Sequence, residues 1–206
     1  MPRLTEVVKH LIVINVLMFF GTKMLMGDNR LMLALYYPGV EYFRPYQLVT
    51  HMFMHANFGH ILFNMLSLAF LGPMIEQLWG SKRFLTYYLL AGFGAMFTHL
   101  AVRYIMINYF GQVQEAYIPV LGASGAIYGV FIAFAMYFPN ARLMLLIPPI
   151  PVRAKYLVVG LIAYDLFSGL SGASTGVAHF AHLGGALFGF LIITYWRVTG
   201  KDQRYY

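Results

Sequence analysis

Four side chains in this sequence have the types needed for nucleophilic catalysis. Ser124 lies in a Gly-Ala-Ser-Gly string at residues 122–125, at the head of a long apolar run, and His60, Asn64 and His182 lie in other apolar runs. Polar side chains inside hydrocarbon are costly and need partners, so they are candidates for a functional site by default. A serine nucleophile, a histidine base and donors for an oxyanion suffice for attack on a carbonyl. The sequence therefore predicts a site for acyl transfer, provided that the elements carrying these residues meet.

The composition indicates where those elements lie. Of the 206 residues, 60% are hydrophobic and 10% are charged, and the mean hydropathy of +0.68 is too apolar for a surface in water. A transmembrane helix needs roughly 20 mainly apolar residues. Six such stretches are present, at about 10–27, 58–79, 84–107, 123–139, 154–170 and 179–197. We therefore expect an all-α membrane protein, a six-transmembrane-helix bundle that forms a single domain over residues 1–206, with its core at about 10–197.

The basic residues predict the orientation of this bundle. If the N-terminus is inside, ten of the 14 Lys and Arg residues lie on the cytoplasmic side. These are Arg3, Lys9, Lys82, Arg83, Arg142, Arg153, Lys155, Arg197, Lys201 and Arg204. The excess of positive charge on that side predicts a protein of the cell membrane with both termini in the cytoplasm.

The formal net charge of +7 could indicate a nucleic-acid partner. The basic residues, however, lie at the ends of the apolar runs and form no stripe with interleaved aromatic residues, so no nucleic acid is expected. The anionic headgroups of the lipid bilayer are the expected partner of these charges. The chain has no cysteine, which excludes disulfides, thiolate catalysis and cysteine-ligated metals.

The segment between the first two apolar runs, residues 28–50, is predicted to be irregular. It is too long for a simple turn, it is rich in Tyr and Phe, and it contains the helix breakers Pro38, Gly39 and Pro45. Aromatic residues gather where a chain lies at the membrane–water interface. We expect a first loop that is partly embedded in the membrane and packs on protein where it enters the apolar zone.

The spacing of His60 and Asn64 places both on one face of the second apolar helix. Four positions correspond to about one helical turn, so both side chains could donate to a single point. An alternative remains open, because a buried His or Asn often only joins neighbouring helices by hydrogen bonds.

Ser124 is expected in the first turn of its helix. There the backbone N–H groups have no acceptor within the helix and the helix dipole favours an anion, so an oxyanion beside the serine would meet donors. Gly122, Gly125 and Gly129 surround the serine, and the last two form a GxxxG pair that allows close approach of another backbone. The alternative is that these small residues only pack and that the serine bonds to its own helix.

His182 leads a second stripe of glycines. Gly185 and Gly189 follow it by three and seven positions, which is one helix face. This helix can press against the glycines beside Ser124 and bring the two side chains within the roughly 2.6 to 3.2 Å that proton transfer needs. His179 is one turn nearer the outer surface, and we expect it to be a loop or rim residue.

These motifs resemble those of the rhomboid family of intramembrane serine proteases. His60 and Asn64 correspond to the family's HxxxN in the second helix, residues 122–125 to its GxSG in the fourth, and residues 182–189 to its HxxGxxxG in the sixth. The three motifs occur in the family's order, and the resemblance covers roughly residues 10–197.

Four further positions match or depart from the family's pattern. Glu76 lies in a GxxxExxxG string, and Tyr128 follows the serine by four positions, where the family's tyrosine stacks on the catalytic histidine. The family's Trp-Arg pair in the first loop appears here as Phe43-Arg44, which puts the detailed role of that pair in doubt.

The resemblance implies a mechanism and a substrate class. Ser124 and His182 would form a catalytic dyad, while His60, Asn64 and the backbone N–H of Ser124 would hold the oxyanion. The glycines of the motifs, Tyr128, Glu76 and Arg44 would support the site. No metal or cofactor is implied, and the substrate would be another membrane protein with a helix-destabilised transmembrane segment.

Two expectations concern the surroundings of this dyad. Asp165, near the outer end of the fifth apolar run, is expected to pack or to cap a loop rather than to act as a third catalytic acid. The Gly- and Ser-rich residues 168–174 are expected to form a flexible loop over a polar cavity that opens to the outer face.

Two other classes of protein are alternatives to the protease. A catalytically inert rhomboid-like pseudoprotease that binds membrane proteins could keep the fold, but would have no reason to retain both Ser124 and His182. A metal or haem membrane protein could use His51, His55, His60 and His99. The first two of these have i, i+4 spacing, but neither an HExxH motif nor a carboxylate companion accompanies them.

Overall fold

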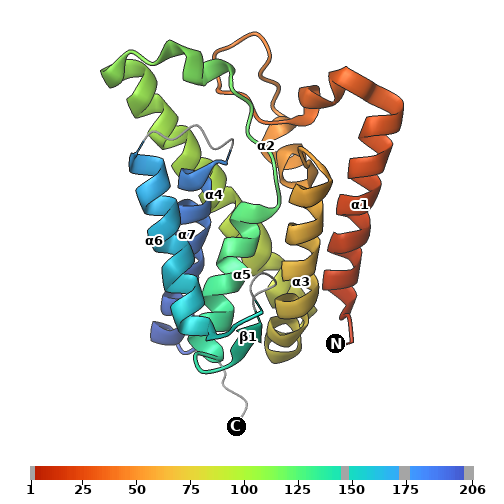
Figure 1. The fold of residues 1–206 in the computed structure, drawn as a ribbon, viewed down its shortest axis with the longest axis vertical. Helices are drawn as coiled ribbons and strands as arrows, with labels where there is room; N and C mark the ends of the chain where they lie inside the picture. The colour runs from red at the N-terminus through yellow and green to blue at the C-terminus, as the bar shows by residue number, and fades with distance from the viewer. Residues whose placement is uncertain (1–2, 145–148, 172–176, 202–206) are drawn as a thin grey trace.

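The computed structural model describes residues 3–144, 149–171 and 177–201, and it is mostly helical (Figure 1). The long helices are α1 (Glu6–Met26), α3 (Phe58–Trp79), α4 (Ser81–Phe110), α5 (Ser124–Tyr137), α6 (Ala154–Leu170) and α7 (His179–Val198). Successive long helices run in opposite directions, so α1 begins and α7 ends at the same end of the bundle (Figure 1).

Four of these helices, α1, α3, α4 and α7, are long and apolar enough to cross a membrane. Helices α5 and α6 are shorter, with 14 and 17 residues. At 1.5 Å per residue α5 is about 21 Å long, which is less than the roughly 30 Å of a bilayer's hydrocarbon core. The structure therefore supports a helical membrane fold with four candidate spans, and the count of six remains a prediction.

Helix α5 is short because the chain before it enters the bundle in an extended conformation. Leu35 and Val120 exchange backbone hydrogen bonds of 2.8 and 2.9 Å, and the N–H of Gly122 donates to the carbonyl of His51 at 2.9 Å. These bonds satisfy the extended backbone where it lies against protein. Ser124, the first residue of α5, therefore begins its helix inside the molecule rather than at its end.

The first loop is irregular, as the sequence predicts. It contains the 3₁₀ helices η1 (Gly27–Leu33) and η2 (His51–Phe53) and the single turn α2 (Gln47–Thr50). Gln47 is completely buried and organises the loop, because its side chain accepts from the N–H of Tyr36 and donates to the carbonyls of Met32 and Tyr42. The position of the first loop relative to a bilayer stays a prediction.

The segments between the long helices differ from the sequence expectation. The strands β1 (Arg142–Met144) and β2 (Pro151–Arg153) form an antiparallel pair between α5 and α6, and the 3₁₀ helix η3 (Val113–Tyr117) follows α4. Of the expected lid, residues 168–170 complete α6, so that part is helix and not loop. Residues 172–174 of the lid lie outside the described residues.

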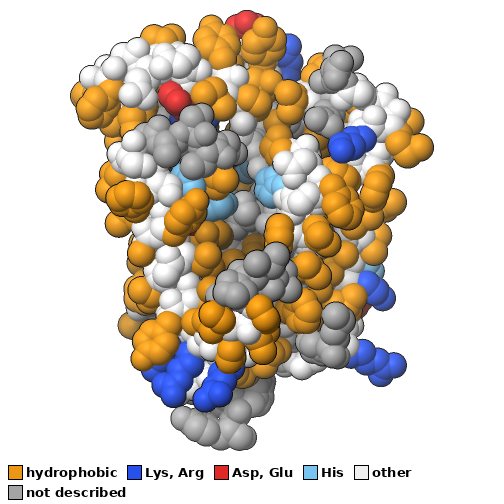
Figure 2. All heavy atoms as spheres, in the orientation of Figure 1, with side chains coloured by type: hydrophobic (Ala, Val, Ile, Leu, Met, Phe, Trp, Pro, Cys, Tyr) orange, Lys and Arg blue, Asp and Glu red, His pale blue; other side chains and the backbone are white. Residues whose placement is uncertain are grey.

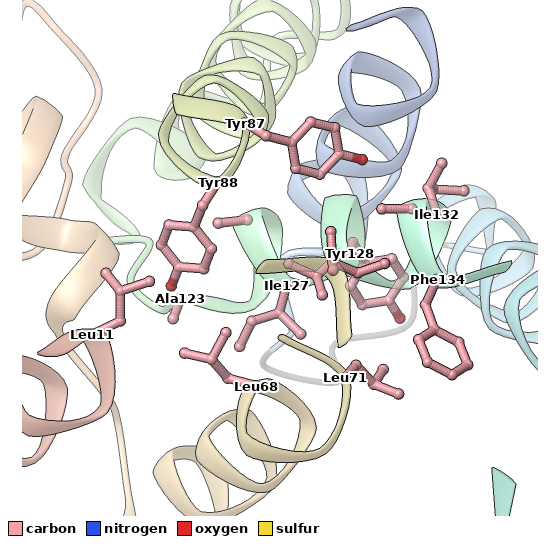
Figure 3. Close-up of a cluster of buried hydrophobic side chains, with 14 of the residues drawn as sticks. Leu11, Leu68, Leu71, Tyr87, Tyr88, Ala123, Ile127, Tyr128, Ile132 and Phe134 are labelled. Carbon is pink, nitrogen blue, oxygen red and sulfur yellow. The ribbon is translucent and has the colours of Figure 1, made fainter. Parts of the chain in front are cut away.

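The surface and the interior both fit a membrane protein. Figure 2 shows hydrophobic side chains over most of the viewed face, with Lys and Arg gathered mainly at the end where α1 begins and α7 ends. In the interior, Ile127 of α5 and Ala123, the residue just before this helix, lie near Leu68 of α3 and Tyr88 of α4 (Figure 3). This core holds α5 at the centre of the bundle.

The glycines bring α5 and α7 into backbone contact. A Cβ at Gly185 would lie 1.9 Å from the carbonyl oxygen of Gly125, and a Cβ at Gly189 would lie 2.9 Å from the Cα of Gly129. Real Cβ atoms do not approach that closely, so a side chain at Gly185 would force the helices apart. On the other side of α5, a Cβ at Gly125 would meet the Cβ of Ala95 in α4 at 2.4 Å. Helix α5 is thus wedged between α4 and α7.

Candidate active site

The contact between α5 and α7 sets the distance between Ser124 and His182. Ser124 Oγ lies 2.9 Å from His182 Nε2, within the range for proton transfer. The ring of Tyr128, one turn after Ser124, stacks on the ring of His182 with 4.3 Å between ring centroids and 13° between planes. The imidazole is therefore held from one side by a parallel aromatic ring while its Nε2 faces the serine.

The other ring nitrogen of His182 faces a carboxylate. His182 Nδ1 lies 3.1 Å from Oδ1 and 3.3 Å from Oδ2 of Asp165 in α6. Asp165 is 1% exposed, and its oxygens also contact His179 Nδ1, at 2.6 Å, and the hydroxyl of Tyr128. The sequence did not predict this contact between the Asp165 carboxylate and the candidate base, and the expected packing or loop-capping role of Asp165 stays a prediction.

His179 differs from its expectation. It is the first residue of α7, but it is 4% exposed and bonds to Asp165, so it is not a rim residue. The signals for this cluster were present in the sequence. Asp165 is the one acidic residue in the run 154–170, where an ionisable group suggests function. His179 and His182 are three positions apart, which places both on one face of a helix.

His60 approaches the serine from α3. Its Nδ1 faces the N–H of Ala56 at 3.4 Å and acts as the acceptor, which leaves Nε2 as the protonated nitrogen. A Cβ at Gly122 would lie 2.9 Å from His60 Nε2 and 3.4 Å from Ser124 Oγ. Gly122 also has φ +135°, a conformation that favours glycine. The missing side chain at this position therefore leaves space between the imidazole N–H and the serine hydroxyl.

Asn64 lies one turn further along α3 from His60. It is 6% exposed, and its Nδ2 is a buried amide nitrogen without a hydrogen-bond partner. A buried donor without an acceptor is costly, so its retention suggests a task that the resting structure does not show. An oxyanion that forms beside Ser124 would be a fitting acceptor.

Glu76, predicted to support the site, lies elsewhere. It is 16 positions after His60 in α3, which is about 24 Å along the helix axis. Its carboxylate accepts from the hydroxyl of Thr5, from the N–H groups of Val7 and Val8 at 3.0 Å each, and from the hydroxyl of Ser81 at 2.7 Å. Glu76 thus caps the start of α1 and joins it to α3 and α4.

Arg44, also predicted to support the site, makes its hydrogen bonds within the first loop. It is exposed, and its Nη1 donates to the carbonyls of Glu41 at 2.7 Å and Phe43 at 2.8 Å. These bonds close a turn of the first loop. Arg44 therefore has a local role in the first loop, and these contacts do not include Ser124 or His182.

The histidines considered for a metal site do not form one cluster within the described residues. His51 Nδ1 bonds to the carbonyl of Gln47 at 2.8 Å, and the ring of His55 packs edge-on against that of His60. Burial lowers the pKa of His51 to about 4 and the pKa of His55 to about 3, so both rings are neutral at pH 7.

The described residues that come closest to a metal-ligand grouping are Asp165, His179 and His182, whose ligand atoms lie within 4.8 Å of one another. The 2.6 Å between His179 Nδ1 and Asp165 Oδ1 is a hydrogen-bond distance. Two ligands about 2.0 Å from a tetrahedral ion would be separated by about 3.3 Å. The arrangement therefore fits a hydrogen-bonded network better than a metal site.

Comparison with known proteins finds similarity to rhomboid proteins. The family model described as "Rhomboid domain" matches residues 42–198. The chain is 33% identical over 151 residues to "Rhomboid protease AarA" of Providencia stuartii, which covers 68% of this chain and 52% of that protein. It is 29% identical to "Rhomboid protein 1, mitochondrial" of Saccharomyces cerevisiae, over 74% of this chain and 42% of the relative.

A third relative is covered over more of its length. The chain is 32% identical over 164 residues to "Putative rhomboid protease YdcA" of Bacillus subtilis, which is 78% of this chain and 71% of that protein. Against the two relatives named before it, this chain spans only about half of their length.

Proposed function

Because the chain belongs to the rhomboid family, we propose that it is an intramembrane serine endopeptidase that cleaves transmembrane segments of other membrane proteins. The observation that carries this proposal is the 2.9 Å contact between Ser124 Oγ and His182 Nε2, made by two helices in backbone contact. A serine that only packed its own helix would not need an imidazole nitrogen at proton-transfer distance.

The proposed reaction has two halves. In the first, His182 Nε2 takes the proton of Ser124 as Oγ attacks a peptide carbonyl, and then returns it to the leaving amine while the acyl-enzyme forms. In the second, His182 takes a proton from water, the hydroxide attacks the acyl carbonyl, and the proton returns to Ser124 as the new carboxyl terminus leaves. Each half regenerates the neutral imidazole.

The oxyanion of each half would be held from α3 and from the start of α5. The donors are His60 Nε2–H, the Nδ2–H of Asn64 and the backbone N–H of Ser124, which has no acceptor within its helix. Three observations support this set: the Nδ1 of His60 is already an acceptor, the amide of Asn64 has no partner, and Gly122 leaves space beside the serine.

Water and substrate would reach Ser124 through a hollow in the surface of the bundle. Figure 2 shows histidine side chains in a hollow of the viewed face, over the N-terminal end of α5. A peptide bond in an intact helix hides its carbonyl, so the substrate segment must unwind before it can be attacked. Segments with small or helix-breaking residues unwind at the lowest cost and are therefore the proposed substrates.

We also propose that both termini lie in the cytoplasm and that the membrane is the cell membrane. The start of α1 and the end of α7 are at one end of the bundle, where most Lys and Arg side chains in the view gather. This distribution is the one that the positive-inside rule assigns to the cytoplasmic side.

The test uses the full chain in liposomes with a fusion protein that carries a transmembrane segment and a reporter. We expect cleavage, and labelling by a fluorophosphonate that peptide mapping places on Ser124. Ser124→Ala and His182→Ala should each abolish both signals. A wild-type chain that binds the fusion protein but is neither labelled nor able to cleave it would indicate an inert relative.

A further inference from the structure

The geometry points to Asp165 as a positioning residue that fixes the tautomer and the orientation of His182, so that Ser124, His182 and Asp165 act as a triad. This inference rests on the proposed function and deepens it, because the resemblance to the family implies a dyad and no third acid. It is carried by contacts among α5, α6 and α7 that the sequence did not predict.

The carboxylate lies where it can orient the base. Asp165 Oδ1 and Oδ2 are 3.1 and 3.3 Å from His182 Nδ1, and on the opposite side of the ring Nε2 is 2.9 Å from Ser124 Oγ. The serine, the imidazole and the carboxylate are therefore connected in series by hydrogen-bond distances. Among the described residues, Asp165 is the carboxylate in contact with the ring of His182.

This series decides which nitrogen of His182 carries the proton. An ionised carboxylate can only accept, so Nδ1 must be the donor in its contact with Asp165. In a neutral imidazole Nε2 then has a free lone pair, which faces the serine hydroxyl. That is the tautomer a general base needs, and a positive imidazolium formed during the reaction would be stabilised by the adjacent negative charge.

The carboxylate is itself held in place by two other donors. Tyr128 donates its hydroxyl to Oδ2, and His179 Nδ1 lies 2.6 Å from Oδ1. Since Asp165 is 1% exposed, an ionised carboxylate at this depth needs such partners. The same tyrosine ring stacks on His182, so Tyr128 constrains both the base and the group that orients it.

A purely structural role makes different predictions for Asp165→Asn. The asparagine has nearly the same volume, and its amide can still bond to His179 or Tyr128, so packing of α6 on α7 is largely kept. Its NH₂ can, however, donate to Nδ1 and so favour the wrong tautomer of His182. We expect kcat and the rate of fluorophosphonate labelling to fall by about 10² to 10⁴, with KM and the thermal midpoint nearly unchanged.

The matched control is Ser168→Ala. Ser168 is a buried polar residue on the same helix, and its described hydrogen bond is to Ser171 and not to Ser124 or His182. This variant should leave kcat and labelling within about twofold. Equal kcat for wild type and Asp165→Asn, with wild type active and Ser124→Ala inactive, would overturn this inference and leave the protease assignment intact. If Asp165→Asn yields less folded protein but has a normal kcat per folded molecule, the inference is likewise overturned and the protease assignment stands.

A second measurement needs no variant of Asp165 and no substrate. Nitrogen NMR of the wild-type chain labelled with ¹⁵N-histidine reports which imidazole nitrogen is protonated, and a His182→Asn sample identifies the signals of His182. We expect the Nδ1–H tautomer at neutral pH. The Nε2–H tautomer would overturn the inference even if Asp165→Asn failed to fold, whereas absence of cleavage and labelling by wild type would refute the protease itself.

Discussion

Two buried carboxylates, Asp165 in α6 and Glu76 in α3, show how differently one chemical group is used within this bundle. They are 1% and 3% exposed, and both accept several hydrogen bonds. The donors to Glu76 are two backbone N–H groups and two hydroxyls. The donors to Asp165 are two imidazole nitrogens and a phenol, and one of those imidazoles also faces a serine.

The difference lies in what the donors can do. Backbone N–H groups do not titrate, so the Glu76 cluster can only fix the start of α1 against α3 and α4. An imidazole can gain a proton near pH 7, so a carboxylate beside it can influence a reaction. Burial and hydrogen-bond number are alike at the two sites, and the chemistry of the partners separates a structural carboxylate from one placed at the candidate active site.

The largest expected effect compares the serines at the two carboxylate clusters. Ser124→Ala should lower cleavage by about 10⁴-fold or more, because the nucleophile is lost, while thermal unfolding in detergent stays unchanged. Ser81→Ala, which removes a hydroxyl donor to Glu76, should leave kcat unchanged and lower the free energy of unfolding by about 1 kcal/mol. Residual cleavage by Ser124→Ala at the wild-type rate would exclude this nucleophile.

The next effect concerns Asn64, which shares α3 with Glu76. Asn64→Ala removes a donor that has no partner in the resting structure, so stability should change little or rise. If its amide holds the oxyanion, kcat should fall by about 10² to 10³. Steady-state cleavage and thermal unfolding of the same preparation measure both quantities, and a stability loss with unchanged kcat would show that Asn64 only joins helices.

Glu76→Gln should lower stability and leave kcat unchanged, whereas Asn64→Ala should lower kcat and leave stability nearly unchanged. The glutamine loses the charge at the start of α1 and presents an NH₂ to groups that are themselves donors. We expect the free energy of unfolding to fall by about 2 to 3 kcal/mol, with kcat per folded molecule unchanged. Denaturation in mixed detergent and active-site titration check this, and a specific loss of kcat would place Glu76 in the reaction after all.

The smallest effect compares the two hydroxyl donors. Tyr128→Phe keeps the ring that stacks on His182 but removes the hydroxyl that bonds to Asp165, so kcat should fall about three- to tenfold with little change in stability. Thr5→Val removes the corresponding donor to Glu76 and should lower stability by about 1 kcal/mol at normal kcat. If Tyr128→Phe and Thr5→Val change kcat and stability in the same way, Asp165 and Glu76 do not differ in role.

The sequence predicted what depends on spacing within one helix. The glycines at positions 125, 129, 185 and 189 predicted two smooth faces, and the structure shows α5 and α7 in backbone contact there. The spacing of His60 and Asn64 likewise follows from the helical repeat. Such relations are local, because the backbone geometry of a helix is the same wherever the helix lies.

Expectations that required knowing how one helix is rotated against another were less successful. Asp165 and His179 were expected to be packing, loop or rim residues, because nothing in either run shows that the C-terminal end of α6 and the N-terminal end of α7 turn these side chains toward each other. Glu76 and Arg44 were assigned to the site by resemblance, yet their contacts lie at the start of α1 and within the first loop. The run expected at 123–139 is helical over residues 124–137, but the sequence did not predict the extended segment before it, because contacts with residues distant in the sequence hold that segment in place.

The sequence by itself determined that this chain has helices suited to a bilayer, that Ser124 and His182 each accompany a glycine face, and that the family is rhomboid. Only the tertiary structure decided that Ser124, His182 and Asp165 stand in one series. The reason is that hydrophobicity and helical period are encoded residue by residue, whereas a hydrogen bond between helices needs relative rotations and depths set by all the packing contacts together.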